Sequence, residues 1–265
     1  MKKIDVKIAL LLSAICVVGT LILVPNQMET LQLYLNPSDY AKLMEEMPFS
    51  IPVLTVISSI QIFIMSFIIA FLGLKIGRKS GFSFAFFETI FEKGKKVIIN
   101  RHSLALSLLF GAITGFILVG ADKFYFQQNI PQLASVTPET SITGMFAGIF
   151  YGGVFEEVLM RLFIMSLFVW IINKVITRGI DSIPNWVYGV SIVIAALLFA
   201  VGHFPATIMY FGELNSTIIF RSLLLNGIGG LFFGYLYWKK GLEYAIFAHM
   251  FAHISVQLLF YPIFY

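Results

Sequence analysis

Three charged residues, Glu156, Glu157 and Arg161, lie in the middle of an apolar stretch, Ile142 to Ile172, that is long enough to cross a bilayer. A charge at the centre of a membrane helix costs roughly 2.5–3.5 kcal/mol on insertion scales, so three together oppose insertion by about 8–10 kcal/mol before any pairing. A chain keeps such groups when they do chemistry, move an ion or lock helices together. These residues are therefore the first candidates for function.

The spacing of the three charges predicts different roles for the two acids. Glu157 and Arg161 are four residues apart with the acid first, the favourable order for an ion pair on one helix face. Glu156 lies about 100° further around an α-helix and cannot share Arg161 equally. We predict that Arg161 neutralises Glu157 in a structural pair. Glu156 then needs another partner, and such a carboxylate suits the role of general base.

Histidines in later apolar stretches are the predicted partners of Glu156. His203 lies slightly outward of the middle of one stretch, and His249 and His253 are four apart near the middle of another. Residues four apart lie on one helix face. Similar depth in the bilayer would let all four side chains meet in one layer. Gly202 and Pro205 flank His203, which predicts a kinked, locally opened helix there.

The elements that position these residues are predicted to be membrane helices. The chain has 265 residues, of which 58% are hydrophobic and only 12% charged, and its mean hydropathy is +0.89. This composition excludes a typical soluble domain. We predict an all-α polytopic membrane protein with a single domain of about seven transmembrane helices, the active site lying between spans four, five and seven. The apolar runs are Ile8–Val24, Ile51–Leu74, Leu104–Gly120, Ile142–Ile172, Trp186–Phe211, Ile218–Trp238 and Leu242–Phe264.

Basic residues lie where membrane topology places them, so the net charge of +4 does not indicate nucleic-acid binding. They gather before span one, between spans two and three, after span four and after span six, whereas the alternate connections are mostly acidic. By the positive-inside rule the N-terminus is cytoplasmic and the C-terminus faces out. The basic residues are Lys2, Lys3, Lys7, Lys75, Arg78, Lys79, Lys93, Lys95, Lys96, Arg101, Lys174, Arg178, Lys239 and Lys240.

The sequence also makes a prediction for each of two regions near the predicted membrane surfaces. Phenylalanines between Phe82 and Phe91 interleave with the lysines that follow, which favours a segment lying in the cytoplasmic interface against anionic lipid. The alternative is a solvated linker with buried phenylalanines. Arg221, near the outer end of span six, is predicted to extend its side chain to the interface.

At these residues the chain resembles a known family. Phe155 to Arg161 fits the Glu-Glu-x-x-x-Arg motif of the type II CAAX prenyl proteases and the bacteriocin-processing (abortive-infection-like) membrane proteases. Phe199 to His203 fits their Phe-x-x-x-His motif, and His249 with His253 occupies the third motif, usually His-x-x-x-Asn. Three motifs in order, each in a membrane span, are more specific than one. The resemblance covers a catalytic core at 141–265, preceded by three further spans at 1–140.

The resemblance implies an intramembrane endopeptidase that acts on a membrane-associated peptide or protein. In this reading Glu156, oriented with His203, activates a water molecule, and His249 with His253 stabilises the oxyanion. Three further residues position this site, namely Glu157, Arg161 and Phe199. Relatives act on prenylated proteins in eukaryotes and on peptide precursors in bacteria, and the short loops favour a bacterial inner membrane.

His253 departs from the family pattern, which has asparagine at this position. Histidine can still donate a hydrogen bond, so the role can survive. Alternatively, Glu156, His203, His249 and His253 form a nitrogen-and-carboxylate set for a divalent metal such as zinc. We favour the glutamate mechanism without a cofactor, because Glu-Glu-x-x-x-Arg is not a familiar metal-ligand spacing.

Two other function classes fit part of the pattern. A catalytically silent relative could bind and regulate a membrane partner, an alternative that the His253 departure supports. Carboxylates and histidines at mid-depth also build proton-coupled transporters. A transporter would need a continuous polar path, whereas the first three spans are almost free of ionisable groups.

Overall fold

The structure is a computed structural model that describes residues 3–134, 136–179 and 182–265. Within these residues it is built of helices, without strands, and seven helices are long and apolar enough to cross a membrane. The predicted fold class and number of spans are thus confirmed. The first three spans comprise α1 (Lys3–Tyr34), α3 (Ile51–Lys79) and α5 (Arg101–Ala121), with α2 (Pro37–Glu46) and α4 (Ala85–Phe91) in the connections. After α5 follow η1 (Asp122–Phe126), α6 (Gln127–Asn129) and α7 (Pro131–Ala134).

Span four differs from the regular α-helix expected from the sequence. It consists of α8 (Ile142–Ala147), the π-helical segments η2 (Gly148–Glu156) and η3 (Val158–Met165), and α9 (Ser166–Val175). A π-helix forms i→i+5 hydrogen bonds, is rare, and frequently occurs at functional sites. Hydropathy does not distinguish this winding from an α-helix, because both give a continuous apolar run. Glu156 is therefore the last residue of the first π-helical segment, and Glu157 lies between the two segments.

Span five is broken at His203, as the flanking glycine and proline predicted. Helix α10 (Asn185–Gly202) ends there, and α11 (Phe204–Phe211) begins directly after it with Pro205 in its first turn. Proline lacks the N–H that a continuous helix would need, so the break falls at this point. Span six is α12 (Ser216–Lys239), and span seven comprises α13 (Leu242–Ser255), η4 (Val256–Phe260) and α14 (Tyr261–Phe264).

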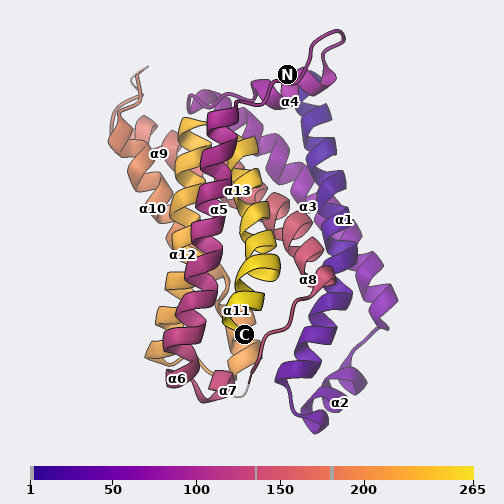
Figure 1. Ribbon diagram of the computed structural model, residues 1–265. Coiled ribbons are helices and arrows are strands. Elements are labelled where there is room, and N and C mark those ends of the chain that lie inside the picture. The colour runs from indigo at the N-terminus through magenta and orange to yellow at the C-terminus, as the bar shows by residue number, and fades with distance from the viewer. Residues whose placement is uncertain (1–2, 135, 180–181) are drawn as a thin grey trace.

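The spans form one bundle in which three pairs of helices pack closely: α1 with α3, α5 with α13, and α10 with α12. Span four contacts members of all three pairs, since η2 packs on α1 and α13 and η3 packs on α3 and α10. The N-terminus and α4 lie at one end of the bundle, whereas α6, α7 and the C-terminus lie at the other (Figure 1). We call these the α4 end and the α7 end.

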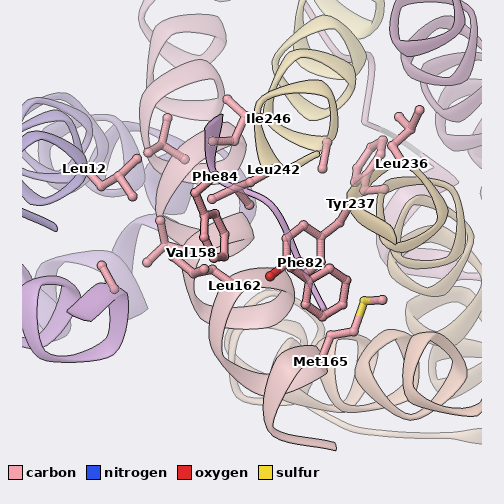
Figure 2. Close-up of a cluster of buried hydrophobic side chains, with 14 of the residues drawn as sticks. Leu12, Phe82, Phe84, Val158, Leu162, Met165, Leu236, Tyr237, Leu242 and Ile246 are labelled. Atoms are coloured by element: carbon pink, nitrogen blue, oxygen red, sulfur yellow. The ribbon is translucent and has the colours of Figure 1, made fainter. Parts of the chain in front are cut away.

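The largest hydrophobic core lies toward the α4 end. Spans four, six and seven contribute to it, and Phe82 and Phe84 insert between them (Figure 2). Phe82, Phe84 and Phe87 are buried, so the predicted interfacial position is wrong for these rings and the alternative with buried phenylalanines holds. The reason is a turn at Gly81, whose φ of +80° returns the chain into the bundle. Phe82 then stacks on Tyr237, with ring centroids 4.2 Å apart.

Arg221 has a charged partner that the sequence did not predict. Its guanidinium pairs with Asp122 at the end of span three, with Nε 2.7 Å from Oδ1 and a second nitrogen 2.5 Å from Oδ2. Two parallel hydrogen bonds between arginine and a carboxylate are stronger and more specific than one. This neighbour could not be found from sequence, because Asp122 and Arg221 belong to spans that are not consecutive.

Candidate active site in the membrane bundle

The predicted ion pair within span four is present and fully buried. Arg161 Nε lies 3.2 Å from Glu157 Oε2, and the two side chains are 1% and 0% exposed. The contact is an ion pair without hydrogen-bond geometry, and within the described chain the guanidinium nitrogens have no hydrogen-bond partner. The rings of Phe199 and Phe233 lie 5.5 and 5.9 Å from the guanidinium carbon, within reach of a cation–π interaction. Arg161 thus depends on Glu157 for its only close counter-charge among the described residues.

Glu157 has a second partner that the sequence did not predict. Its Oε1 lies 2.9 Å from Nδ1 of His249 in span seven. An ionised carboxylate only accepts hydrogen bonds, so Nδ1 of His249 carries a hydrogen and donates it. This contact fixes the orientation of the ring and turns Nε2 toward Glu156. Helical spacing gives no sign of the contact, because it joins spans four and seven laterally.

Glu156 points away from Arg161, as its spacing predicted. Its side chain is 21% exposed, and Oε2 lies 3.7 Å from Nε2 of His249. That distance is too long for a direct hydrogen bond but short enough for one water molecule to contact both atoms. Glu156 therefore faces a cavity, whereas its neighbour Glu157 is held in the protein interior.

His203 is held by the break in span five. Its Nδ1 lies 2.8 Å from the carbonyl oxygen of Phe199, one helical turn earlier. Because a carbonyl oxygen only accepts, Nδ1 is the protonated nitrogen, and Nε2 of the neutral ring is left as an acceptor. The Phe199 ring packs edge-on against the imidazole, with centroids 4.6 Å apart. Phe199 thus positions His203 with both its backbone and its side chain.

The ring of His249 lies between two other rings. His253 stacks on one face at a centroid distance of 5.2 Å, and Phe233 stacks on the other at 4.7 Å. His253 in turn lies directly against glycines of span four. A Cβ atom added at Gly152 would be 2.6 Å from Nε2 of His253 and 3.4 Å from Nε2 of His249. Glycine at this position therefore allows spans four and seven to approach closely.

One cavity brings the predicted residues together. Glu156, His203, His249 and His253 all line a cavity of about 120 Å³, which we call the catalytic cavity after the roles that the sequence predicts for these residues. Asn226 of span six also lines it and was not among the predicted site residues; its Nδ2 donates to the carbonyl oxygen of Ser222. The only sequence signal for a place in the site is that Asn226 is a polar residue within an apolar span.

A second cavity, of about 210 Å³, lies on the other side of Glu156 and His203. Apart from these two residues its lining is mainly apolar and aromatic, with Tyr151, Leu159 and Leu198 among the contributors. Glu156 and His203 thus separate a more polar space from a more apolar one. Such a pair of spaces can hold a peptide bond at the polar groups and an apolar side chain beside them.

The fit of a metal ion can be judged from the donor atoms. Within residues 3–134, 136–179 and 182–265, no group of three or more histidine, cysteine, aspartate or glutamate side chains is arranged to hold a metal. The Nδ1 atoms of His203 and His249 are engaged by Phe199 and Glu157, which leaves both Nε2 atoms free, as in metal-ligating histidines. The described side chains differ from the tetrahedral site that zinc prefers because three of their donor atoms do not converge.

Comparison with known proteins gives one match. Residues 138–255 match the model of the family described as type II CAAX prenyl endopeptidase Rce1-like. All three motifs lie inside this region, so the family resemblance is confirmed. No curated protein and no solved structure matches the chain. Residues 138–255 are thus similar to an endopeptidase family, and the seven apolar helices indicate an integral membrane protein.

Proposed function

We propose that the protein is an intramembrane endopeptidase in which Glu156 activates water to hydrolyse a peptide bond. The observation that supports this most directly is the shared cavity, where a carboxylate of span four meets imidazoles of spans five and seven. The match of residues 138–255 to an endopeptidase family supports the same reaction class. Within the bundle the site is shielded from bulk water, so each charge acts with greater strength on the reacting groups.

In the first step, a water molecule binds between Glu156 and His203. Nε2 of His203 accepts one hydrogen of this water, because Nδ1 is committed to Phe199. Glu156 takes the other proton as general base. The water oxygen then forms a bond to the carbonyl carbon of the substrate, and the electron pair of the carbonyl double bond moves onto its oxygen.

In the second step, His249 stabilises that oxygen. It lies between two carboxylates, with Nδ1 2.9 Å from Glu157 and Nε2 3.7 Å from Glu156, and in this proposal it carries a hydrogen on both nitrogens. Its Nε2–H can then donate to the oxyanion in the catalytic cavity. Collapse of the intermediate breaks the carbon–nitrogen bond, and Glu156 returns its proton to the leaving amine. Glu157 holds His249 much as a triad carboxylate holds its histidine.

The remaining residues have supporting roles. Arg161 holds Glu157 in place, and His253 supports the ring of His249 by stacking. His253 occupies the position of the asparagine in the family pattern, and its role in this proposal is a packing contact. The substrate in this proposal is a membrane-associated peptide or protein, such as a peptide precursor of the bacteriocin type, in the inner membrane of a bacterium.

Comparative membrane proteomics tests the proposal. Cells that carry Glu156→Gln in place of the wild-type protein should accumulate one or more uncleaved precursors. Glu243→Gln is the matched control, because Glu243 also lies in a span but lines neither cavity at the site. Equal precursor levels in wild-type and Glu156→Gln cells, with both proteins present and folded, would show that Glu156 is not the base.

A further inference from the structure

The catalytic cavity is the innermost of three adjoining cavities. It shares Leu118, Leu225 and Val256 with a cavity of about 180 Å³, which we call the middle cavity. The middle cavity in turn shares Val136, Pro138 and Tyr261 with a cavity of about 650 Å³, the outer cavity. Three cavities that adjoin through common lining residues therefore connect Glu156 with the α7 end of the bundle.

The opposite direction is closed by packed side chains. Toward the α4 end, the positions beyond the catalytic residues belong to the hydrophobic core shown in Figure 2. Leu162 and Met165 of span four and Leu236 of span six are fully buried there, and none of them lines the cavities described above. Tyr237 closes the same layer through a hydrogen bond of 2.8 Å with Ser166. A cavity of about 500 Å³ also lies at the α4 end, beside Lys240 and Glu243, but it shares no lining residue with the catalytic cavity. The path of shared cavity walls from the site to an end of the bundle thus leads to the α7 end.

Charge distinguishes the same two ends. The long basic connection between α3 and α5 lies at the α4 end (Figure 1), where Lys239 and Lys240 at the end of α12 line a cavity together with Ala85 of α4. At the α7 end, Asp122 and Arg221 line the middle cavity and neutralise each other. By the positive-inside rule the α4 end is cytoplasmic, so the cavities lead to the outer side of the membrane.

The lining of the outer cavity fits a peptide backbone. It consists largely of uncharged hydroxyl and amide groups, with Thr30, Thr137 and Gln257 among them, and Glu139 is its one acidic residue in the described part of the chain. Gln257 anchors the non-helical segment before span four, since its Oε1 accepts from the backbone N–H of Ser141 at 2.8 Å. Such groups can replace the hydrogen bonds that a peptide loses when it leaves water. An acyl or prenyl chain would gain nothing from them.

We infer that water and substrate reach Glu156 from the outer side, through the outer and middle cavities. The substrate is then an exported or outer-leaflet peptide segment rather than the tail of a prenylated cytoplasmic protein. The substrate class rests on the proposed function, whereas the direction of access does not. Labelling of engineered cysteines can therefore test the direction without any proteolytic assay.

The chain suits this experiment because Cys16 is its only cysteine and is buried. In a Cys16→Ser background, Leu118→Cys and Leu225→Cys place a thiol on the wall between the middle and catalytic cavities. Leu162→Cys, in the filled core, serves as the control for a buried position, and Lys96→Cys marks the α4 end. The probe is a positively charged methanethiosulfonate that does not cross membranes, applied to intact cells and to inside-out vesicles.

We expect Leu118→Cys and Leu225→Cys to react in intact cells, Lys96→Cys to react only in inside-out vesicles, and Leu162→Cys to react in neither. Reaction of both wall cysteines only in inside-out vesicles, or in neither preparation while Lys96→Cys reacts, would overturn the inference. So would reaction of Lys96→Cys in intact cells. If the wall cysteines react from outside but Glu156→Gln accumulates no precursor, the proposed function fails while the access route stands.

Discussion

Replacing Glu157 by glutamine should destabilise the folded protein by about 3–5 kcal/mol, the cost typical of removing one partner from a buried ion pair. The substitution keeps the size of the side chain and an oxygen that can accept from His249. It removes the only close counter-charge of Arg161 among the described residues. The glutamine amide also presents N–H donors to a guanidinium that is itself only a donor.

The magnitude follows from the geometry. At 3.2 Å between Nε and Oε2, with an effective dielectric constant of about 20, the Coulomb attraction is about 5 kcal/mol. The rings of Phe199 and Phe233 attract the guanidinium of Arg161 by on the order of 1–2 kcal/mol. This cation–π attraction is the same in the wild-type protein and in Glu157→Gln. Loss of the carboxylate should therefore dominate the change in the free energy of unfolding.

The assay is equilibrium unfolding of the purified protein in mixed detergent micelles, run as a double-mutant cycle. Glu157→Gln and Arg161→Met should each be strongly destabilised. The combined variant should recover much of the loss, since removing both charges leaves neither one buried alone. Glu213→Gln, at an exposed span end, is the control and should stay within about 0.5 kcal/mol of wild type.

Two results would refute this reasoning. If Glu157→Gln unfolds within about 1 kcal/mol of wild type, the pair does not carry the stability that its burial implies. If the losses of the two single variants simply add in the combined variant, Glu157 and Arg161 do not interact in the folded state.

Three further predictions concern the site and its support. Gly152→Ala should lower kcat on an identified substrate by about a hundredfold, the scale on which a misplacement of about 1 Å acts. The added Cβ would displace His253, which stacks on His249. Gly227→Ala, where a Cβ meets nothing within 4 Å, should leave kcat near that of wild type, and equal kcat for both variants would contradict the packing argument. Tyr237→Phe removes the hydrogen bond to Ser166 in the hydrophobic core, so it should lower the free energy of unfolding by about 0.5–1.5 kcal/mol. Cleavage should be unchanged, and a large loss of activity would show that this layer of the core belongs to the site. Dialysis against a zinc chelator should leave cleavage by the purified protein unchanged, and activity that is lost and then restored by zinc would favour the metal alternative.

Much of the architecture could be predicted from the sequence because the bilayer constrains it strongly. Hydropathy gives the depth of each residue, which was sufficient for the seven spans. The glycine and proline beside His203 were sufficient for the break in span five. Helical spacing was sufficient for the contact between Glu157 and Arg161, since both lie on one segment. These features are local or depend on depth alone.

Lateral neighbours could not be predicted in the same way. The contact of Glu157 with His249 and the pair of Asp122 with Arg221 depend on which spans pack together. The π-helical winding of span four likewise depends on packing against its neighbours, and hydropathy does not reveal it. Sequence placed the candidate residues at one depth, and the packing of the bundle then placed them in one cavity.

The most direct test of the central claim is cleavage in water enriched in oxygen-18, with the purified protein and a precursor identified by proteomics. If Glu156 activates water for attack on the carbonyl, the wild-type protein will give a product that carries one heavy oxygen at its new carboxyl terminus. Glu156→Gln, folded to the same extent, will give no product. Cleavage by Glu156→Gln at the wild-type rate, or a wild-type product without the heavy oxygen, would contradict the mechanism.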